Sequence, residues 1–171
     1  MEDKQFLWQV FQRVDLDKSG YISSTELQQS LLNGSWEPFN LETCRLMIKM
    51  FDKEKKGMIS FQDFGALWNY ITEWQNCFRG FDKDNSGSIN NHELLTALQT
   101  FGMKFPLKTV DVIIKRFEKG TEGNIFLDDF IHCCVILQNI TNGFKKLDPY
   151  NRGEINVKYE DFVELIFEAG L

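Results

Sequence analysis

Two twelve-residue segments of the chain place oxygen-bearing side chains at the same spacing. They span residues 15–26 and 82–93. Each has an oxygen ligand at positions 1, 3 and 5, a glycine at position 6, an apolar residue at position 8 and a glutamate at position 12. A hard cation takes about six to eight oxygen ligands, and the glycine permits the sharp turn around the ion. Because such a loop joins two helices, the pattern predicts a helix on each side of both segments.

The expected ligands form two equivalent sets. They are Asp15, Asp17, Ser19, Tyr21, Ser23 and Glu26 in the first segment, and Asp82, Asp84, Ser86, Ser88, Asn90 and Glu93 in the second. Position 7 would bind through its backbone carbonyl, and position 12 would supply two carboxylate oxygens. Position 5 is serine in both segments instead of Asp or Asn, so each site has one charge fewer than it could have. We expect two strong Ca²⁺ sites per chain, with Mg²⁺ as a competitor. A solvated acidic loop is the alternative for a single match.

Composition excludes several functional classes. The formal net charge of −6 disfavours nucleic acid as a partner and suits a protein that captures cations. No apolar run approaches the ~20 residues of a membrane span, so we expect membrane contact to be indirect. The four cysteines lack metal-ligand spacing and are expected to be core thiols of a reduced, intracellular protein without a signal peptide. No Ser/His/Asp or Cys/His set is apparent, and His92 and His132 are isolated, so we do not expect an enzyme.

An internal repeat organises the whole chain. Five loops follow a large apolar residue and have isoleucine at position 8; we number them loop 1 (15–26), loop 2 (52–63), loop 3 (82–93), loop 4 (118–129) and loop 5 (148–161). Loops 2, 4 and 5 have lost ligands. Lys56 places an ammonium at position 5 of loop 2, Gly120 replaces the ligand at position 3 of loop 4, and loop 5 has Tyr150 and Arg152 at positions 3 and 5. These loops keep the apolar residues that mark the loop fold, but they lose acidic side chains that would bind the ion.

Each loop and its two flanking helices form a helix–loop–helix unit, which we call a hand. The spacing of apolar residues predicts that some neighbouring hands share one continuous helix. It predicts continuous helices over 61–81 and 127–147, each about 32 Å long. Segments 33–38 and 101–106 read instead as linkers within pairs. Hands one and two should therefore pair, hands three and four should pair, and the fifth is left over. We expect a single all-α domain over 1–171, with eight helices, short paired strands in the loops and a fifth hand used for dimerisation.

The odd fifth hand, the shared long helices and the extra residues in loop 5 resemble the penta-EF-hand family over essentially the whole chain. The stretches that carry the resemblance are 6–15, 25–29, 74–76, 82–87, 130–131 and 137–138. The resemblance implies a calcium-dependent adaptor that dimerises through its fifth hand. Apolar residues of the last helix also predict such a surface: Tyr159, Phe162, Val163, Ile166 and Phe167.

The resemblance further implies the partner, which is a Pro-rich, Tyr-containing peptide of endosomal-sorting or coat proteins. Carried over by position, the main peptide pocket comprises Ile71, Trp74, Phe101, Leu127, Leu137, Gln138 and Tyr159. A second pocket comprises Leu32, Trp36, Phe64 and Trp68. The basic residue beside the main pocket is arginine in the family and Lys104 here. An aromatic stripe at helical spacing is more often core than binding site, and Phe61 and Phe78 are expected to be core.

Three functional classes remain open at this stage. The leading one is the calcium-dependent adaptor, in the cytoplasm with calcium-dependent recruitment to endoplasmic-reticulum exit sites or endosomes, and with the nucleus as a further location. A calcium buffer is the second, since buffers barely open when they bind the ion. The third is a regulatory subunit of a calpain-like enzyme, in which the fifth hand would pair with a different penta-EF-hand chain. Partner choice at the fifth hand, homodimer or heterodimer, separates the third class from the others.

Overall fold

The computed structural model describes residues 4–33, 36–118, 120 and 123–169. These residues form eight helices, as expected: α1 (Lys4–Val14), α2 (Ser24–Ser30), α3 (Leu41–Phe51), α4 (Phe61–Phe81), α5 (Asn91–Thr100), α6 (Leu107–Phe117), α7 (Leu127–Leu147) and α8 (Tyr159–Glu168). Two short strands, β1 (Tyr21–Ile22) and β2 (Ile59–Ser60), complete the described elements. Residues 34–35 of the first expected linker and residues 119 and 121–122 of loop 4 lie outside the described part, as do 1–3 and 170–171 of the expected domain.

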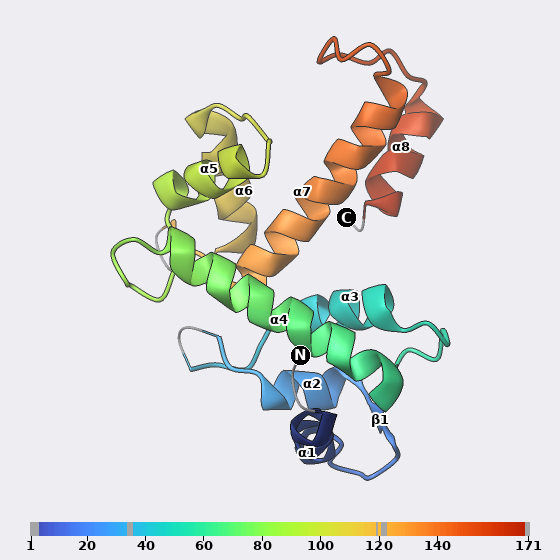
Figure 1. Ribbon diagram of the computed structural model, residues 1–171. Helices are drawn as coiled ribbons and strands as arrows, with labels where there is room; N and C mark the ends of the chain where they lie inside the picture. Colours follow the sequence, from blue (N-terminus) through green and yellow to red (C-terminus); the bar gives the residue numbers. More distant parts are fainter. Residues whose placement is uncertain (1–3, 34–35, 119, 121–122, 170–171) are drawn as a thin grey trace.

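The two long helices link neighbouring hands and have the bounds that the apolar spacing predicts. In Figure 1, α4 (green) runs from the second hand to the third, and α7 (orange) runs from the fourth hand to the fifth. The two helices pack against each other, and α8 packs along α7. Gly143 lies at the α7–α8 contact, where a Cβ atom would overlap the side chain of Leu165. The fifth hand is therefore held to the rest of the molecule through α7.

Loop pairing follows the expected order. Strands β1 and β2 join loops 1 and 2 in antiparallel register, with Ile22 opposite Ile59. Loops 3 and 4 are joined by a bridge in which the backbone N–H groups of Ile89 and Ile125 donate to each other's carbonyl groups at 2.8 and 3.0 Å. Ile155, the equivalent residue of loop 5, is in no strand or bridge among the described residues. Hands one to four thus form two pairs, and the fifth hand has no loop partner within the chain.

One apolar core spans both pairs. Phe11 and Phe64 fill it between α1 and α4, with ring centroids 5.4 Å apart. Phe130 of α7 contacts Trp74 and Phe78 of α4, with ring centroids 5.7 and 5.6 Å apart. These edge-to-face contacts connect the N-terminal pair to the C-terminal pair through the two long helices.

All four cysteines are free thiols. Cys44, Cys133 and Cys134 are buried and Cys77 is half-buried, so the expectation of core thiols holds for three of them. Burial, with a smaller contribution from Asp128, raises the pKa of Cys44 to about 12. No helix among the described residues is both long and apolar enough to cross a membrane.

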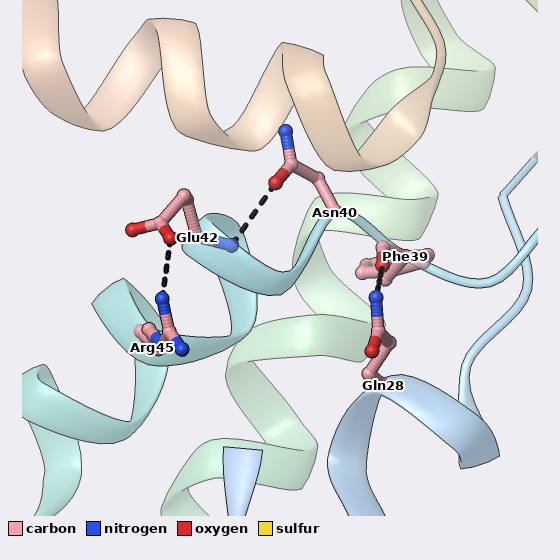
Figure 2. A network of polar contacts seen from close by, with 5 residues as sticks. All are labelled: Gln28, Phe39, Asn40, Glu42 and Arg45. Atoms are coloured by element: carbon pink, nitrogen blue, oxygen red, sulfur yellow. Dashed lines mark hydrogen bonds and ion pairs between the residues drawn. The ribbon is translucent and has the colours of Figure 1, made fainter. Parts of the chain in front are cut away.

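Polar contacts fix α3 against α7. Asn40 is the N-cap of α3 and accepts a hydrogen bond from the Glu42 backbone N–H at 3.0 Å (Figure 2). Its own N–H donates to Asp128 Oδ2 at 2.8 Å, and its side-chain amide donates to Asp129 Oδ1 at 3.0 Å. The Thr43 hydroxyl donates to the Asp128 carbonyl at 3.2 Å. Since Asp128 and Asp129 are buried, the two bonds from Asn40 offset part of the cost of desolvating their carboxylates.

Candidate calcium sites and partner surfaces

Loops 1 and 3 each bring three carboxylates together. Within each group, one carboxylate oxygen from every member lies within 4.8 Å of the others; the groups are Asp15, Asp17 and Glu26, and Asp82, Asp84 and Glu93. These are the acids at positions 1, 3 and 12 that the sequence assigns to Ca²⁺. Oxygen-only donors with this charge suit a hard divalent cation. The donor sets of both loops therefore fit calcium.

Backbone N–H groups hold the first aspartate of each site in place. Asp15 accepts from Ser19 and Gly20 at 3.0 and 2.9 Å. Asp82 accepts equivalent bonds from Ser86 and Gly87, both at 3.0 Å. Gly20 has a φ of +82°, a left-handed conformation that residues with a Cβ rarely adopt. The loop is thus folded around its position-1 carboxylate by the turn that the glycine permits.

The position-12 glutamates join each loop to the following helix. Glu26 forms a capping box with Ser23 at the start of α2, and its other carboxylate oxygen accepts from the Leu16 N–H at 3.0 Å. Glu93 forms the same box with Asn90 at the start of α5 and accepts from Lys83 N–H at 2.8 Å. A change in either carboxylate therefore acts directly on the helix that it caps.

Hydrogen bonds favour the ionised form of several ligands. Bonds from the side chain and backbone of Ser19 lower the pKa of Asp17, and Ser86 lowers the pKa of Asp84 in the same way. Burial raises the pKa of Glu26, but bonds from Ser23 and from the loop backbone outweigh it, and the pKa is lowered overall. The serine at position 5, which has no charge of its own, thus stabilises the carboxylate at position 3 in the form that binds cations.

Lysines pair with two of the three acids of loop 2. The sequence predicts an ammonium from Lys56 at position 5, and this group pairs with Glu54 and donates to the Tyr21 hydroxyl at 2.8 Å. The structure adds Lys53, whose Nζ lies 2.8 Å from Oδ1 of Asp63 at position 12. The Lys53 pair was not predicted from the sequence, because position 2 is not a ligand position.

Loops 4 and 5 keep the hydrogen bond that folds each loop around its position-1 carboxylate. In loop 5, Asp148 accepts from the backbone N–H groups of Arg152 and Gly153 at 2.9 and 2.8 Å, as the first aspartates of loops 1 and 3 do. In loop 4, Gly123 N–H donates to Glu118 at 2.7 Å, while Asp129 at position 12 bonds to Asn40. Among the described residues, only loops 1 and 3 form groups of three candidate metal-binding side chains.

The expected peptide-binding residues divide by exposure. Exposed residues are Leu32, Trp36, Phe101, Lys104, Gln138 and Tyr159, and half-buried residues are Trp68, Trp74 and Leu137. Phe64, Ile71 and Leu127, by contrast, belong to the core, with 2, 4 and 7% of their surface exposed. They lie on the inner face of their helices. The surface that is accessible to a peptide is therefore smaller than the two expected pockets.

One pocket of about 420 Å³ combines members of both expected sets. Leu32 and Leu127 line it together with Phe78, and its wall includes Asp82 and Gly87 of loop 3. The ring of Phe101 lies against Trp74, with centroids 6.1 Å apart. The rest of the pocket's lining is polar: Asn33, Gln75, Arg79 and Asn85. A pocket of mixed lining therefore shares a wall with the first residue of a candidate calcium site.

Three of the five residues expected at a dimer interface form an exposed face of α8. Tyr159, Phe162 and Phe167 have 80, 48 and 72% of their surface exposed. Val163 and Ile166 are half-buried, and α8 has no fully buried residue.

Comparison with known proteins identifies the family. The sequence profile of the EF-hand domain pair matches residues 4–68 and 71–134, which contain loops 1 to 4. Sorcin from Mus musculus is 39% identical over 153 residues, which cover 87% of this chain and 76% of sorcin. The chain belongs to the calcium-binding penta-EF-hand family.

Other relatives of this penta-EF-hand chain agree. Peflin from Homo sapiens is 40% identical over 166 residues, which cover 96% of the chain and 58% of peflin, so the chain spans less than two thirds of that relative. A solved structure, described as a homolog of programmed cell death 6 protein from Leishmania major Friedlin, has a TM-score of 0.83 and 26% identity, covering 97% of this chain and 95% of the other. The stretches quoted above resemble programmed cell death 6 protein in particular, which agrees with this match.

Proposed function

We propose that this penta-EF-hand protein is a calcium sensor and adaptor, not an enzyme. Calcium at loops 1 and 3 opens an apolar groove that binds Pro- and Tyr-rich segments of membrane-trafficking proteins. The observation that supports this most directly is the pocket between Leu32 and Leu127, because Asp82 forms part of its wall and is also the first ligand of loop 3. An ion that draws Asp82 inward moves that wall.

Two exposed aromatic side chains of the expected pockets suit the proposed ligand. Trp36 has 83% of its surface exposed and Phe101 has 38%, which is more than a monomer needs to leave in water. An extended Pro-rich segment loses little conformational entropy on docking, and aromatic surfaces accommodate its rings. Lys104 is exposed three residues beyond Phe101 and can take up a different position when α5 moves.

A peptide-binding assay tests the proposal. Fluorescence anisotropy of a labelled Pro/Tyr-rich peptide should rise with the protein in calcium and stay low in chelator. Phe101→Ala should weaken binding of the peptide by about ten-fold, the usual size for loss of an aromatic anchor, while calcium binding stays unchanged. Val112→Ala, at an exposed position of α6, is the control. Equal binding in calcium and in chelator would refute the sensor mechanism.

The two alternatives predict different results in simple experiments. A calcium buffer would bind the ions without opening the pocket, so the fluorescence of a hydrophobic dye would not rise with calcium. A regulatory subunit would use the exposed face of α8 for a different penta-EF-hand chain, and mixing the two chains would give heterodimers in place of homodimers. We favour the homodimeric adaptor, located in the cytoplasm and recruited to endoplasmic-reticulum exit sites or endosomes when calcium rises.

A further inference from the structure

The solvent-facing side of α3 borders two pockets that the calcium sites and the proposed Pro/Tyr groove do not use. Arg45 and Lys49, one helical turn apart, line both pockets. The two pockets therefore adjoin along α3, and we call them together the α3 groove. The groove is rich in cations although the whole chain has a formal charge of −6.

The first pocket lies at the junction of α3 with α6 and α7. It has a volume of about 340 Å³, and its apolar lining comes from Leu46, Phe117 and Ile136. Arg116 adds a third guanidinium or ammonium group to its wall and lies over the Phe117 ring, 5.8 Å from the centroid. The pocket thus has an apolar floor with permanent positive charge around it.

His132 completes that wall as a neutral group. Its ring contacts Phe117 edge to face, with centroids 5.6 Å apart. Burial lowers the pKa of His132, so the ring is uncharged near neutral pH and can exchange hydrogen bonds. The positive charge of the pocket is therefore supplied by its arginine and lysine side chains.

The second pocket extends the groove toward loop 2. It has a volume of about 490 Å³ and is lined by Ser24, Arg45, Ile48, Lys49, Asp52, Lys55 and Gly57. Lys55 adds a fourth cation to the groove, and Ile48 adds an apolar surface.

Two acids border the groove, and both have partners within the chain. Glu42 pairs with Arg45 at 2.6 Å, as Figure 2 shows, and Asp52 accepts from the Gly57 N–H at 2.6 Å. Four cations against two acids leave the groove with a net positive charge. It is therefore complementary to an anionic ligand.

We propose that the α3 groove binds an extended acidic peptide in which carboxylates alternate with apolar side chains. The carboxylates pair with Arg45, Lys49 and Arg116, and an apolar side chain enters the pocket over Phe117. Two adjoining pockets match an extended segment better than a single small anion, which would leave the apolar floor unused. A planar anionic membrane is a poorer fit, because the floor lies in a concavity between helices.

Binding of a designed peptide tests this proposal. The probe is a labelled twelve-residue peptide that alternates Glu with Leu, measured by anisotropy in chelator, where the proposed Pro/Tyr interaction is absent. Failure of one proposal is then distinguishable from failure of the other. The double variant Arg45→Glu/Lys49→Glu should weaken binding by about ten-fold or more. The matched control Lys108→Glu/Lys145→Glu changes the net charge equally at exposed sites outside the groove and should change affinity less than about two-fold.

Sister peptides separate charge from apolar contact. Replacing Glu by Gln should abolish binding, and replacing Leu by Ser should weaken it, because both kinds of contact are required. Circular dichroism checks that the variants are folded. The proposal is overturned if the control variant loses as much affinity as the groove variant, or if the Gln peptide binds as well. It is also overturned if phosphatidylserine vesicles bind through Arg45 and Lys49 while the acidic peptide does not.

Discussion

Position 12 of the loops shows how one side chain decides between metal binding and structural use. Glu26 and Glu93 reach back over their loops to the other acidic ligands. Aspartate is one methylene shorter, and where it occupies this position the chain supplies a different partner. Asp63 pairs with Lys53, and Asp129 bonds to Asn40 across the molecule. The sequence reveals the shorter side chain but not the partner that replaces the metal.

Removing the position-12 charge should therefore delete one calcium site at a time. Glu26→Gln and Glu93→Gln keep the length of the side chain but lose its charge and its bidentate geometry. Calorimetric titration should give two strong sites for the unmodified protein and one for each variant. Asp148→Asn in loop 5 is the control and should leave the stoichiometry unchanged. A value near four or five for the unmodified protein would mean that loops 2, 4 and 5 bind calcium, contrary to this prediction.

At the scale of elements, the local pattern of apolar residues predicted where the helices lie. It did not predict the contacts between helices that are distant in the sequence. Apolar spacing predicted the bounds of α4 and α7. The contrast between these continuous helices and the linkers 33–38 and 101–106 predicted which hands pair. The sequence did not reveal that α3 is fastened to α7, since Asn40 and Asp128 are 88 positions apart. Burial of Phe64 and Ile71 was missed for a related reason: an aromatic stripe marks one face of a helix but not whether another helix covers it.

The Asn40 contact should contribute measurably to stability. Asn40→Ala removes the α3 cap and the side-chain bond to buried Asp129, so the free energy of unfolding should fall by about 1–3 kcal/mol. Asn40→Ser keeps a capping oxygen but loses the amide donor. Its free energy of unfolding should lie between the values for Asn40→Ala and for the unmodified protein. Urea unfolding monitored by circular dichroism gives both values. Equal stability of all three proteins would show that the cap and the bond to α7 are dispensable.

At the scale of the whole molecule, the odd number of hands leaves one apolar face without a partner in the chain. Loops 1 to 4 pair internally, whereas Ile155 of loop 5 is in no strand or bridge among the described residues. Helix α8 packs on α7 with one side only, and Tyr159, Phe162 and Phe167 remain exposed. A second copy of the chain offers the same loop edge and the same helix face, so a two-fold symmetric contact would cover both.

The expected consequence is a dimer whose stability comes from packing and not from metal. Phe162→Asp or Phe167→Asp replaces an exposed ring, so the monomer fold should be unaffected. In a symmetric interface each substitution counts twice, and losing roughly 1.5 kcal/mol per side chain raises the dimer Kd by about 100-fold. Light scattering at micromolar concentration should give twice the chain mass for the unmodified protein, in calcium and in chelator alike. Val112→Asp, an exposed apolar position on α6, should remain dimeric. A monomeric mass for the unmodified protein in both buffers would show that the face of α8 stays open to water.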